Sequence, residues 1–287
     1  MSNIPIDLPP MPTEQEDFAG LKSGAVPSAL DHEPDSSGKL LSWRHHIWKN
    51  PLPLASSSAE VAQAMIEMAA YFDKRGWVGA TAGNISCRLT TSSDGIQRMA
   101  MTATGTWKGL LVPDDILEID FEGNLIDSSA CTVSKKPSTE TPLHAVVYSM
   151  IPSSRCIAHV HSSNAAVLSR LALKRSGRPK QVVLGVSGYS YLKAFQNGKD
   201  GKGRLFVPIF DDHLPWPELV TLVSAYLEKH PSCLSFILDG HGQFTWGRDL
   251  EETQRHTESL EQVLEMEKLR LLLDSTESLD LYRCDAK

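Results

Sequence analysis

Two histidines, His159 and His161, stand two residues apart at the end of the apolar stretch 157–161. Alternate residues of a strand point to the same face, so both imidazoles can reach one point in space. A third histidine, His241, follows the apolar run 234–238. Three imidazoles around one cation are typical of a catalytic zinc, whose fourth position stays open for a substrate. The spacing therefore predicts a metal site at His159, His161 and His241.

A histidine by itself is more often structural than metal-binding. Two on one face of a buried strand are harder to explain in that way, because each ring has two nitrogens to satisfy away from water. Three histidines do not select one metal, so we expect Zn²⁺, with Fe²⁺ or Mn²⁺ as alternatives.

Polar side chains cluster where a helix is expected to begin. Glu140 could act there as a general acid or base or as a fourth metal ligand, although the helix dipole alone also favours a glutamate at this position. Ser138 and Thr139 precede it and could bind an anion together with free backbone N–H groups. Two glycine-rich loops have a similar character, although ordinary turns use the same residue types. Together these loops could hold a phosphate through Thr81, Gly83, Asn84, Thr104 and Gly105.

The elements that would position these residues alternate between helical and strand periodicity. Helices are expected from a capping box at Ser57 and Glu60 to Gly76, over 138–150, 163–173 and 216–229, and from Asp249 to Leu273. The turn-rich loop 76–86 is expected to run into a strand, and further strands are expected over 99–103, 157–161, 204–210 and 234–238. A hairpin is expected over 117–126, while 182–195 fits either type. The alternation favours one α/β domain with a mixed sheet and helices on both faces.

Composition and charge limit the classes of function. The formal net charge of −7 over 287 residues argues against nucleic-acid binding by broad charge attraction. No apolar run approaches the ~20 residues of a membrane span, and the N-terminus lacks the basic start and apolar core of a secretory signal. Five cysteines without CxxC spacing suggest reduced thiols. We therefore expect a cytoplasmic protein with neither a nucleic-acid nor a membrane partner.

Five short motifs resemble the class II aldolase/adducin family in order and spacing, over about 57–273. They are Thr81-Ala82-Gly83-Asn84-Ile85-Ser86, Thr104-Gly105, Pro137-Ser138-Thr139-Glu140, His159-Val160-His161 and Gly240-His241-Gly242. The resemblance implies a three-layer αβα fold with a mixed central sheet, a homotetramer with sites at subunit interfaces, and a phosphorylated sugar substrate. It also implies residue roles: zinc at His159, His161 and His241, catalysis by Glu140, and substrate phosphate at Thr81, Asn84, Thr104, Gly105, Ser138 and Thr139.

The same resemblance divides the chain into three regions. A Pro/Ser-rich N-terminal extension would cover 1–56, the catalytic domain 57–275, and a C-terminal tail 276–287. Within the family, further stretches are most similar to methylthioribulose-1-phosphate dehydratases, which are zinc lyases of methionine salvage. These stretches are 76–77, 108–109, 167–170, 208–211 and 245–249.

One departure from that subgroup bears on the chemistry. The dehydratases read Gly-Tyr-Glu where this chain has Gly188-Tyr189-Ser190, and the glutamate is their proposed acid/base. A serine hydroxyl cannot replace it directly, and acid/base catalysis contributes roughly 10²–10⁴-fold. Glu140 would then have to serve, assisted by Tyr189, by Tyr191 or by a water held by Ser190. In addition, Trp107 replaces a family histidine.

Four functions therefore stay open. Dehydration of a ketose 1-phosphate is the first, and aldol cleavage of a phosphorylated sugar is the second. Cleavage depends less on the missing glutamate, because Glu140 matches the aldolases' catalytic position. An enzyme recruited to a specialised pathway and an adducin-like binding module are the others, although adducin-type domains tend to lose the metal histidines. The remaining residues have ordinary interpretations: a surface position for His213 and a solvated hairpin tip at 199–204. His144 is expected to form a local pair with Glu140, with a ligand role as the alternative. Lys108 is expected to be an exposed loop residue, although it could reach a phosphate.

Overall fold

The structure of the protein, a computed structural model, describes residues 58–90, 94–126, 135–195, 203–273 and 278–283. Within these ranges the strands form one nine-stranded sheet with the order β3-β2-β1-β4-β8-β7-β6-β5-β9. Neighbouring strands are antiparallel except β6 and β7, so the sheet is mixed. The strands are β1 Asn84–Arg88, β2 Arg98–Thr102, β3 Ile116–Asp120, β4 Cys156–Val160, β5 Gln181–Ser187, β6 Arg204–Phe210, β7 Ser235–Leu238, β8 Gly242–Gly247 and β9 Asp280–Arg283.

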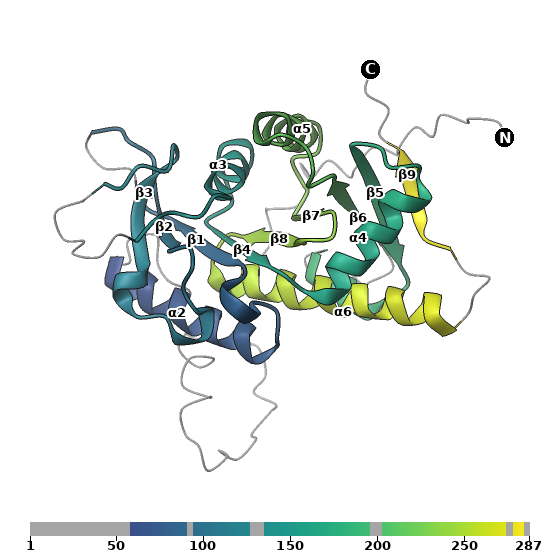
Figure 1. The fold of residues 1–287 in the computed structure, drawn as a ribbon, viewed down its shortest axis with the longest axis horizontal. Coiled ribbons are helices and arrows are strands. Elements are labelled where there is room, and N and C mark those ends of the chain that lie inside the picture. Colours follow the sequence, from purple (N-terminus) through teal and green to yellow (C-terminus); the bar gives the residue numbers. More distant parts are fainter. Residues whose placement is uncertain (1–57, 91–93, 127–134, 196–202, 274–277, 284–287) are drawn as a thin grey trace, which may run out of the picture.

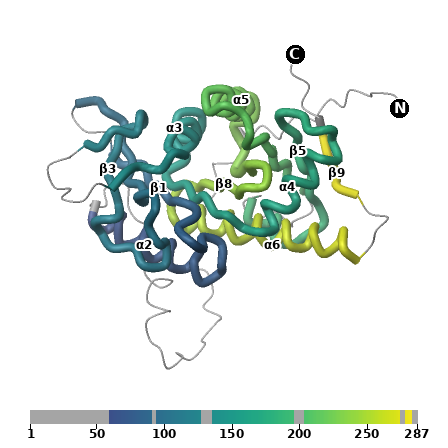
Figure 2. Tube along the Cα trace, in the orientation of Figure 1, coloured from purple at the N-terminus to yellow at the C-terminus, as the bar shows by residue number. Residues whose placement is uncertain are grey.

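Helices cover both faces of this sheet (Figure 1). The helices α3 (Thr141–Met150) and α5 (Trp216–Lys229) pack on one face. On the other face lie α2 (Ser58–Lys74), α4 (Ser163–Arg175) and α6 (Leu250–Leu273). In the trace of Figure 2, α6 runs along the lower edge of the molecule from α2 to the region of α4. The expected three-layer αβα fold with a mixed central sheet is confirmed.

Apolar side chains at helical spacing account for this packing. On α5, Leu219, Val223 and Leu227 are buried in the core together with Phe236 and Trp246 of the sheet. Apolar residues three or four positions apart form such a stripe on one face of a helix. The central strands β4 and β7 are buried along their whole length, as expected for strands covered on both faces. They form a rigid frame for the turns at their ends.

The direction of each strand determines at which end of the sheet the following loop lies. Val160 of β4 lies opposite Gln243 of β8, and β7 ends beside the start of β8. We call the end where β4 and β7 finish the histidine end. Because β5 runs antiparallel to β6, its last residue, Ser187, lies opposite Arg204 at the other end of the sheet.

Several elements differ from expectation. The helix α3 begins at Thr141 and not at Ser138, because Ser138 forms a preceding turn in which its carbonyl accepts from Thr141 N at 3.1 Å. The expected hairpin is reduced to β3 and one bridge between Ile119 and Leu125. Strand β8 was not expected. Strand β9 lies in the segment expected as a C-terminal tail, and its pairing with β5 makes it part of the sheet.

The ambiguous segment 182–195 divides into β5 and a 3₁₀ helix, η4 (Ser190–Phe195). The predicted extension 1–56 and residues 199–202 of the predicted hairpin tip lie outside the described residues. The described cysteines, Cys87, Cys156 and Cys233, are buried and form no disulfide. None of the helices in the described ranges is both long and apolar enough to cross a membrane.

Candidate active site

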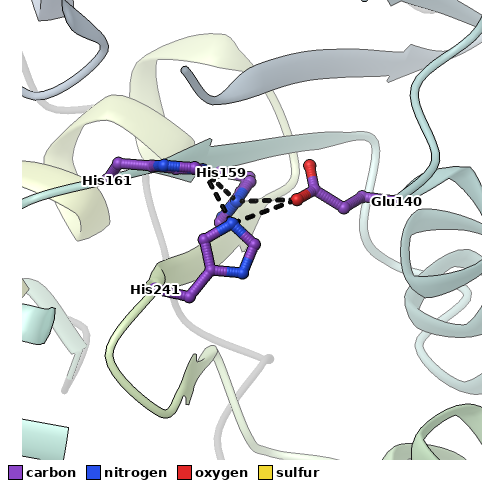
Figure 3. Close-up of side chains that lie close together, drawn as sticks. All are labelled: Glu140, His159, His161 and His241. Atoms are coloured by element: carbon purple, nitrogen blue, oxygen red, sulfur yellow. Dashed lines mark hydrogen bonds and ion pairs between the residues drawn. The ribbon is translucent and has the colours of Figure 1, made fainter. Parts of the chain in front are cut away.

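Four side chains from three segments meet at the histidine end of the sheet (Figure 3). Nε2 of His161 lies 2.9 Å from Nε2 of His159 and 2.9 Å from Nε2 of His241. Oε1 of Glu140 lies 3.5 Å from Nε2 of His159 and 3.2 Å from Nε2 of His241. One potential ligand atom of each residue lies within 4.8 Å of all the others. The structure thus brings together the three histidines and the glutamate singled out in the sequence.

The ends of β4 and β7 position the three imidazoles. His159 is the penultimate residue of β4 and is fully buried, and His161 follows the strand directly. His241 lies in the short turn between β7 and β8. A Cβ atom added to Gly242 would lie 2.2 Å from the carbonyl oxygen of Val160. The turn therefore approaches β4 so closely that only glycine fits, which places His241 beside His161.

Aromatic packing orients His159. Phe244 of β8 stacks on its imidazole with ring centroids 3.9 Å apart and an interplanar angle of 14°. Phe236 of β7 stacks on Phe244 in turn at 4.5 Å. This column fixes the plane of the His159 ring from inside the core. Its two phenylalanines were not expected to have a role at the site.

The ring nitrogens are arranged for a cation. Nδ1 of His159 lies 3.1 Å from the carbonyl oxygen of Gln243, which can only accept, so the neutral ring carries its proton on Nδ1 and a lone pair on Nε2. The Nε2 atoms of His161 and His241 converge on the same place. A tetrahedral Zn²⁺ with Zn–N distances of about 2.0–2.1 Å would separate its nitrogens by roughly 3.3 Å. The observed separations of 2.9 Å are close to this value, so the residues fit such an ion.

Asp212 supports His241 on the far side of the ring. Its Oδ2 lies 3.2 Å from Nδ1 of His241. A carboxylate on the second nitrogen of a metal-binding imidazole fixes the tautomer and raises its basicity. Burial lowers the pKa of His241, but hydrogen bonds to Asp212 and Glu140 outweigh it and raise this pKa to about 9. Sequence reasoning missed Asp212, although its place just after β6, at the histidine end, was a usable signal.

Two polar side chains hold Glu140. Its Oε2 accepts a hydrogen bond from Nδ2 of Asn84 and lies 3.4 Å from Oγ of Ser138. Burial would raise the pKa of Glu140, but the facing imidazoles of His159 and His241 outweigh burial and lower this pKa well below its usual range. An ionised carboxylate in this position can act as a base or as a ligand.

The segments expected to bind phosphate are linked around Glu140. Nδ2 of Asn84 donates to Oγ of Ser138 at 3.1 Å. The backbone N–H of Thr104 donates to the carbonyl of Lys136 at 3.0 Å, which joins the third segment to this group. Thr104, Gly105 and Thr139 are exposed, and Thr81 and Ser138 are half-buried. The structure brings the segments together, and phosphate binding by their residues stays a prediction.

The expectation that Lys108 is an exposed loop residue is wrong. Its side chain is 2% exposed, because the short helix η2 (Lys108–Leu110) packs against α2 and turns the lysine inward. Nζ donates to the carbonyl oxygens of Thr81, at 3.1 Å, and Thr106, at 2.9 Å. Burial lowers the pKa of Lys108 to about 8.

Tyr189 and Ser190 lie far from the histidines of the same chain. They follow the end of β5, which is at the opposite end of the sheet from His159. Burial and a hydrogen bond to Glu267 of α6 raise the pKa of Tyr189, so its hydroxyl faces that helix. One chain therefore does not bring these two expected catalytic residues to Glu140, and a role for them at the site requires a second chain.

Two other histidines lie outside the group. His144 is fully buried one turn after Glu140, and its Nδ1 lies 2.7 Å from Oγ of Ser86. Burial lowers the pKa of His144 to about 3. No side-chain hydrogen bond joins it to Glu140 in the described part of the chain, so the expected local pair does not form. His213 is exposed, as expected, and lies 3.0 Å from Asp211.

The fold and this site define the class of protein. Residues 63–267 match the family described as Class II Aldolase and Adducin N-terminal domain. The chain belongs to the class II aldolase/adducin family. A methylthioribulose-1-phosphate dehydratase of Methylococcus capsulatus is 37% identical over 206 residues, covering 72% of this chain and 92% of the relative. A protein of the same name from Pseudomonas aeruginosa is 36% identical over 208 residues, covering 72% and 93%.

Solved structures agree with this fold. YgbL from Klebsiella pneumoniae aligns with a TM-score of 0.57 and 23% identity, over 80% of this chain and 97% of that one. The L-fuculose-1-phosphate aldolase from Thermus thermophilus aligns with a TM-score of 0.57 and 21% identity, over 77% and 100%. The expected class II aldolase-like architecture is confirmed. The relatives support a lyase of this family.

Proposed function

We propose that the chain is a zinc-dependent lyase acting on a phosphorylated ketose, and that the reaction is the dehydration of methylthioribulose 1-phosphate in methionine salvage. The convergence of three Nε2 atoms with the carboxylate of Glu140 carries this proposal. Relatives with this name at 34–37% identity support the choice of substrate. His159, His161 and His241 would hold Zn²⁺, with Fe²⁺ or Mn²⁺ as alternatives.

The metal, when bound, polarises the carbonyl and a neighbouring hydroxyl of the sugar. Glu140 removes the proton beside that carbonyl: the facing imidazoles keep its carboxylate ionised, and its Oε1 lies 3.2 Å from Nε2 of His241, next to the place where the sugar would bind. Asn84 and Ser138 hold one oxygen of Glu140, which leaves the other facing the centre. The phosphate of the substrate is bound by Thr81, Asn84, Thr104, Gly105, Ser138 and Thr139.

Loss of water from the next carbon needs a proton donor. Tyr189 and Ser190 are candidates only if a neighbouring subunit supplies them, because strand direction separates them from Glu140 within one chain. We therefore propose a homotetramer with its sites at subunit interfaces. The hydroxyl of Ser190 would position a water, because a serine hydroxyl is too weak an acid to donate the proton itself.

The alternative is a class II sugar-phosphate aldolase, or an enzyme recruited to a specialised pathway on the same fold. One observation favours cleavage: Glu140 faces the histidines directly, while the position of the dehydratases' glutamate is Ser190, at the other end of the sheet. In either case the catalytic domain would cover 57–275 together with β9. The enzyme would act in the cytoplasm on a small phosphorylated sugar, without nucleic-acid or membrane partners.

Product analysis separates these reactions. The purified zinc-loaded chain is incubated with methylthioribulose 1-phosphate, next to its Ser190→Glu and Glu140→Gln variants. A diketone formed by the wild-type protein at enzyme-like rates, and lost in Glu140→Gln, is the expected result. Dihydroxyacetone phosphate and an aldehyde from sugar phosphates would identify an aldolase instead. Dehydration by Ser190→Glu alone would mean that the native protein catalyses a different reaction.

A further inference from the structure

Lys108 is a buried cation that forms no ion pair with any residue that the structure describes. Its side chain is 2% exposed, and Nζ donates to two backbone carbonyls. Among the described residues no carboxylate lies within ion-pair distance of this nitrogen, and the negative charges of Glu140 and Asp115 act on it from farther away and raise its pKa. Buried charges are normally paired, because removing an ion from water is costly. An ammonium also has three donors, of which two are used.

The two carbonyls belong to the two loops expected to hold a phosphate. Thr81 lies in the first loop, and Thr106 directly follows Thr104 and Gly105 in the second. The lysine is therefore a link between loops that are 25 positions apart along the chain, counted from Thr81 to Thr106. Loss of this link would free the two loops to move independently.

The first loop is held in an unusual conformation at this contact. Ala80 has φ 58° and Thr81 has φ 83°, and neither residue is glycine. A β-branched residue in the left-handed region is an outlier that persists only where its surroundings fix it. The bond from Lys108 to the carbonyl of Thr81 is one contact that fixes it. Such strained segments concentrate at ligand-binding sites.

We propose that Lys108 is a positioning residue for the phosphate of the substrate: it ties the Thr81 loop to the Thr104–Thr106 loop and supplies the positive charge that a bound phosphate dianion neutralises. The proposal rests on the proposed function, since it assumes a phosphorylated substrate. Burial lowers the pKa of Lys108 only to about 8, so the ammonium is mostly charged at neutral pH. In the described part of the chain Nζ of Lys108 donates to Thr81 and Thr106 and to none of the histidines, and its charge acts on His161 only from a distance, so its loss would leave the three imidazoles in place.

The test compares three full-length variants with the wild-type protein. Lys108→Met removes the charge at similar length, Lys108→Arg keeps it, and Lys180→Met is the matched control, since Lys180 is an exposed lysine paired with Glu218. Each protein is assayed for zinc content, for its dissociation constant for inorganic phosphate by calorimetry, and for KM and kcat with methylthioribulose 1-phosphate. A merely structural role would lower the folded fraction without a selective effect on phosphate.

We expect Lys108→Met to keep one zinc ion per chain and to weaken phosphate binding roughly tenfold or more, with a matching rise in KM and a smaller change in kcat. Lys108→Arg should recover part of the affinity, and Lys180→Met should behave as wild type. Phosphate binding by Lys108→Met within twofold of wild type would overturn the proposal. If Lys108→Met does not fold, amide hydrogen exchange of the wild-type protein is measured with and without inorganic phosphate. The proposal expects phosphate to slow exchange in both loops, 79–84 and 104–108, and an unchanged exchange rate in either loop would overturn it.

The outcomes also separate this proposal from the proposed function. Lys108-dependent phosphate binding without turnover of any ketose phosphate would reject the lyase and keep the phosphate site. Turnover of methylthioribulose 1-phosphate with a KM that Lys108→Met leaves unchanged would reject the role of Lys108 and keep the lyase. A wild-type protein that binds neither inorganic phosphate nor a ketose phosphate would reject both.

Discussion

The contact between Asp212 and His241 makes a quantitative prediction about metal affinity. Asp212→Asn keeps the size of the side chain and removes its negative charge at 3.2 Å from Nδ1 of His241. Loss of such a partner typically weakens metal binding 10–100-fold. The side chain of Asp212 is 30% exposed, so solvent screening places the effect in the lower part of that range. We expect a loss of roughly 10–30-fold in zinc affinity, or about 1.4–2 kcal/mol.

The assay is a competition for zinc with a chelator of known affinity. A proton competes with the metal for His241 below its pKa of about 9, and Asp212→Asn would also weaken that competition. The comparison is therefore made at a pH well above 9, where most of the wild-type His241 is neutral. Asp94→Asn is the matched control, because Asp94 is a partly exposed aspartate that pairs with Arg98 at the start of β2, away from the histidine end of the sheet. Equal zinc affinity of Asp212→Asn and wild type, or an equal loss in Asp94→Asn, would refute the reasoning.

Three further predictions concern other parts of the site. Glu140→Gln should retain zinc and lower kcat by roughly 10²–10⁴-fold; loss of zinc in this variant would instead identify Glu140 as the fourth ligand. Gly242→Ala should lower the free energy of unfolding by about 1–3 kcal/mol or more, because its Cβ would meet the carbonyl oxygen of Val160; Gly79→Ala, where nothing lies within 4 Å, is the control in denaturant titrations. Burial lowers the pKa of Lys108 to about 8, so between pH 8 and about 10 the folded chain loses this proton while the unfolded chain keeps it. The free energy of unfolding of the wild type should therefore rise with pH relative to that of Lys108→Met. The expected gain is on the order of 2 kcal/mol after allowance for solvent screening. Parallel pH dependence of the two proteins' unfolding would contradict that burial cost.

The sequence predicted that His159, His161 and His241 meet, because the spacing of these histidines has a simple geometric meaning. His159 and His161 share one face of a strand, and His241 follows a buried strand whose end is also at the histidine end. Pairing across the sheet was not readable from these residues, because periodicity gives the type of an element and not its neighbours. The unexpected strand β8 supplies that connection, since it pairs with both β4 and β7.

The side chains that support the site were less accessible to prediction. The contacts of Asp212 and Lys108 depend on how their loops orient these side chains. Loop composition alone does not say whether a lysine side chain points outward or inward. The prediction for Lys108 followed the usual preference of lysine for the surface. The structure differs because the carbonyls of Thr81 and Thr106 accept hydrogen bonds from Nζ inside the protein. Tyr189 and Ser190 came from motif comparison, which says nothing about strand direction, and β5 places them away from Glu140.

Zinc K-edge X-ray absorption on the metal-loaded protein tests the central claim most directly. The account predicts three imidazole nitrogens at about 2.0–2.1 Å and no sulfur ligand, with one imidazole fewer in His161→Ala. Sulfur at about 2.3 Å, or a nitrogen shell unchanged by His161→Ala, would contradict a metal held jointly by His159, His161 and His241.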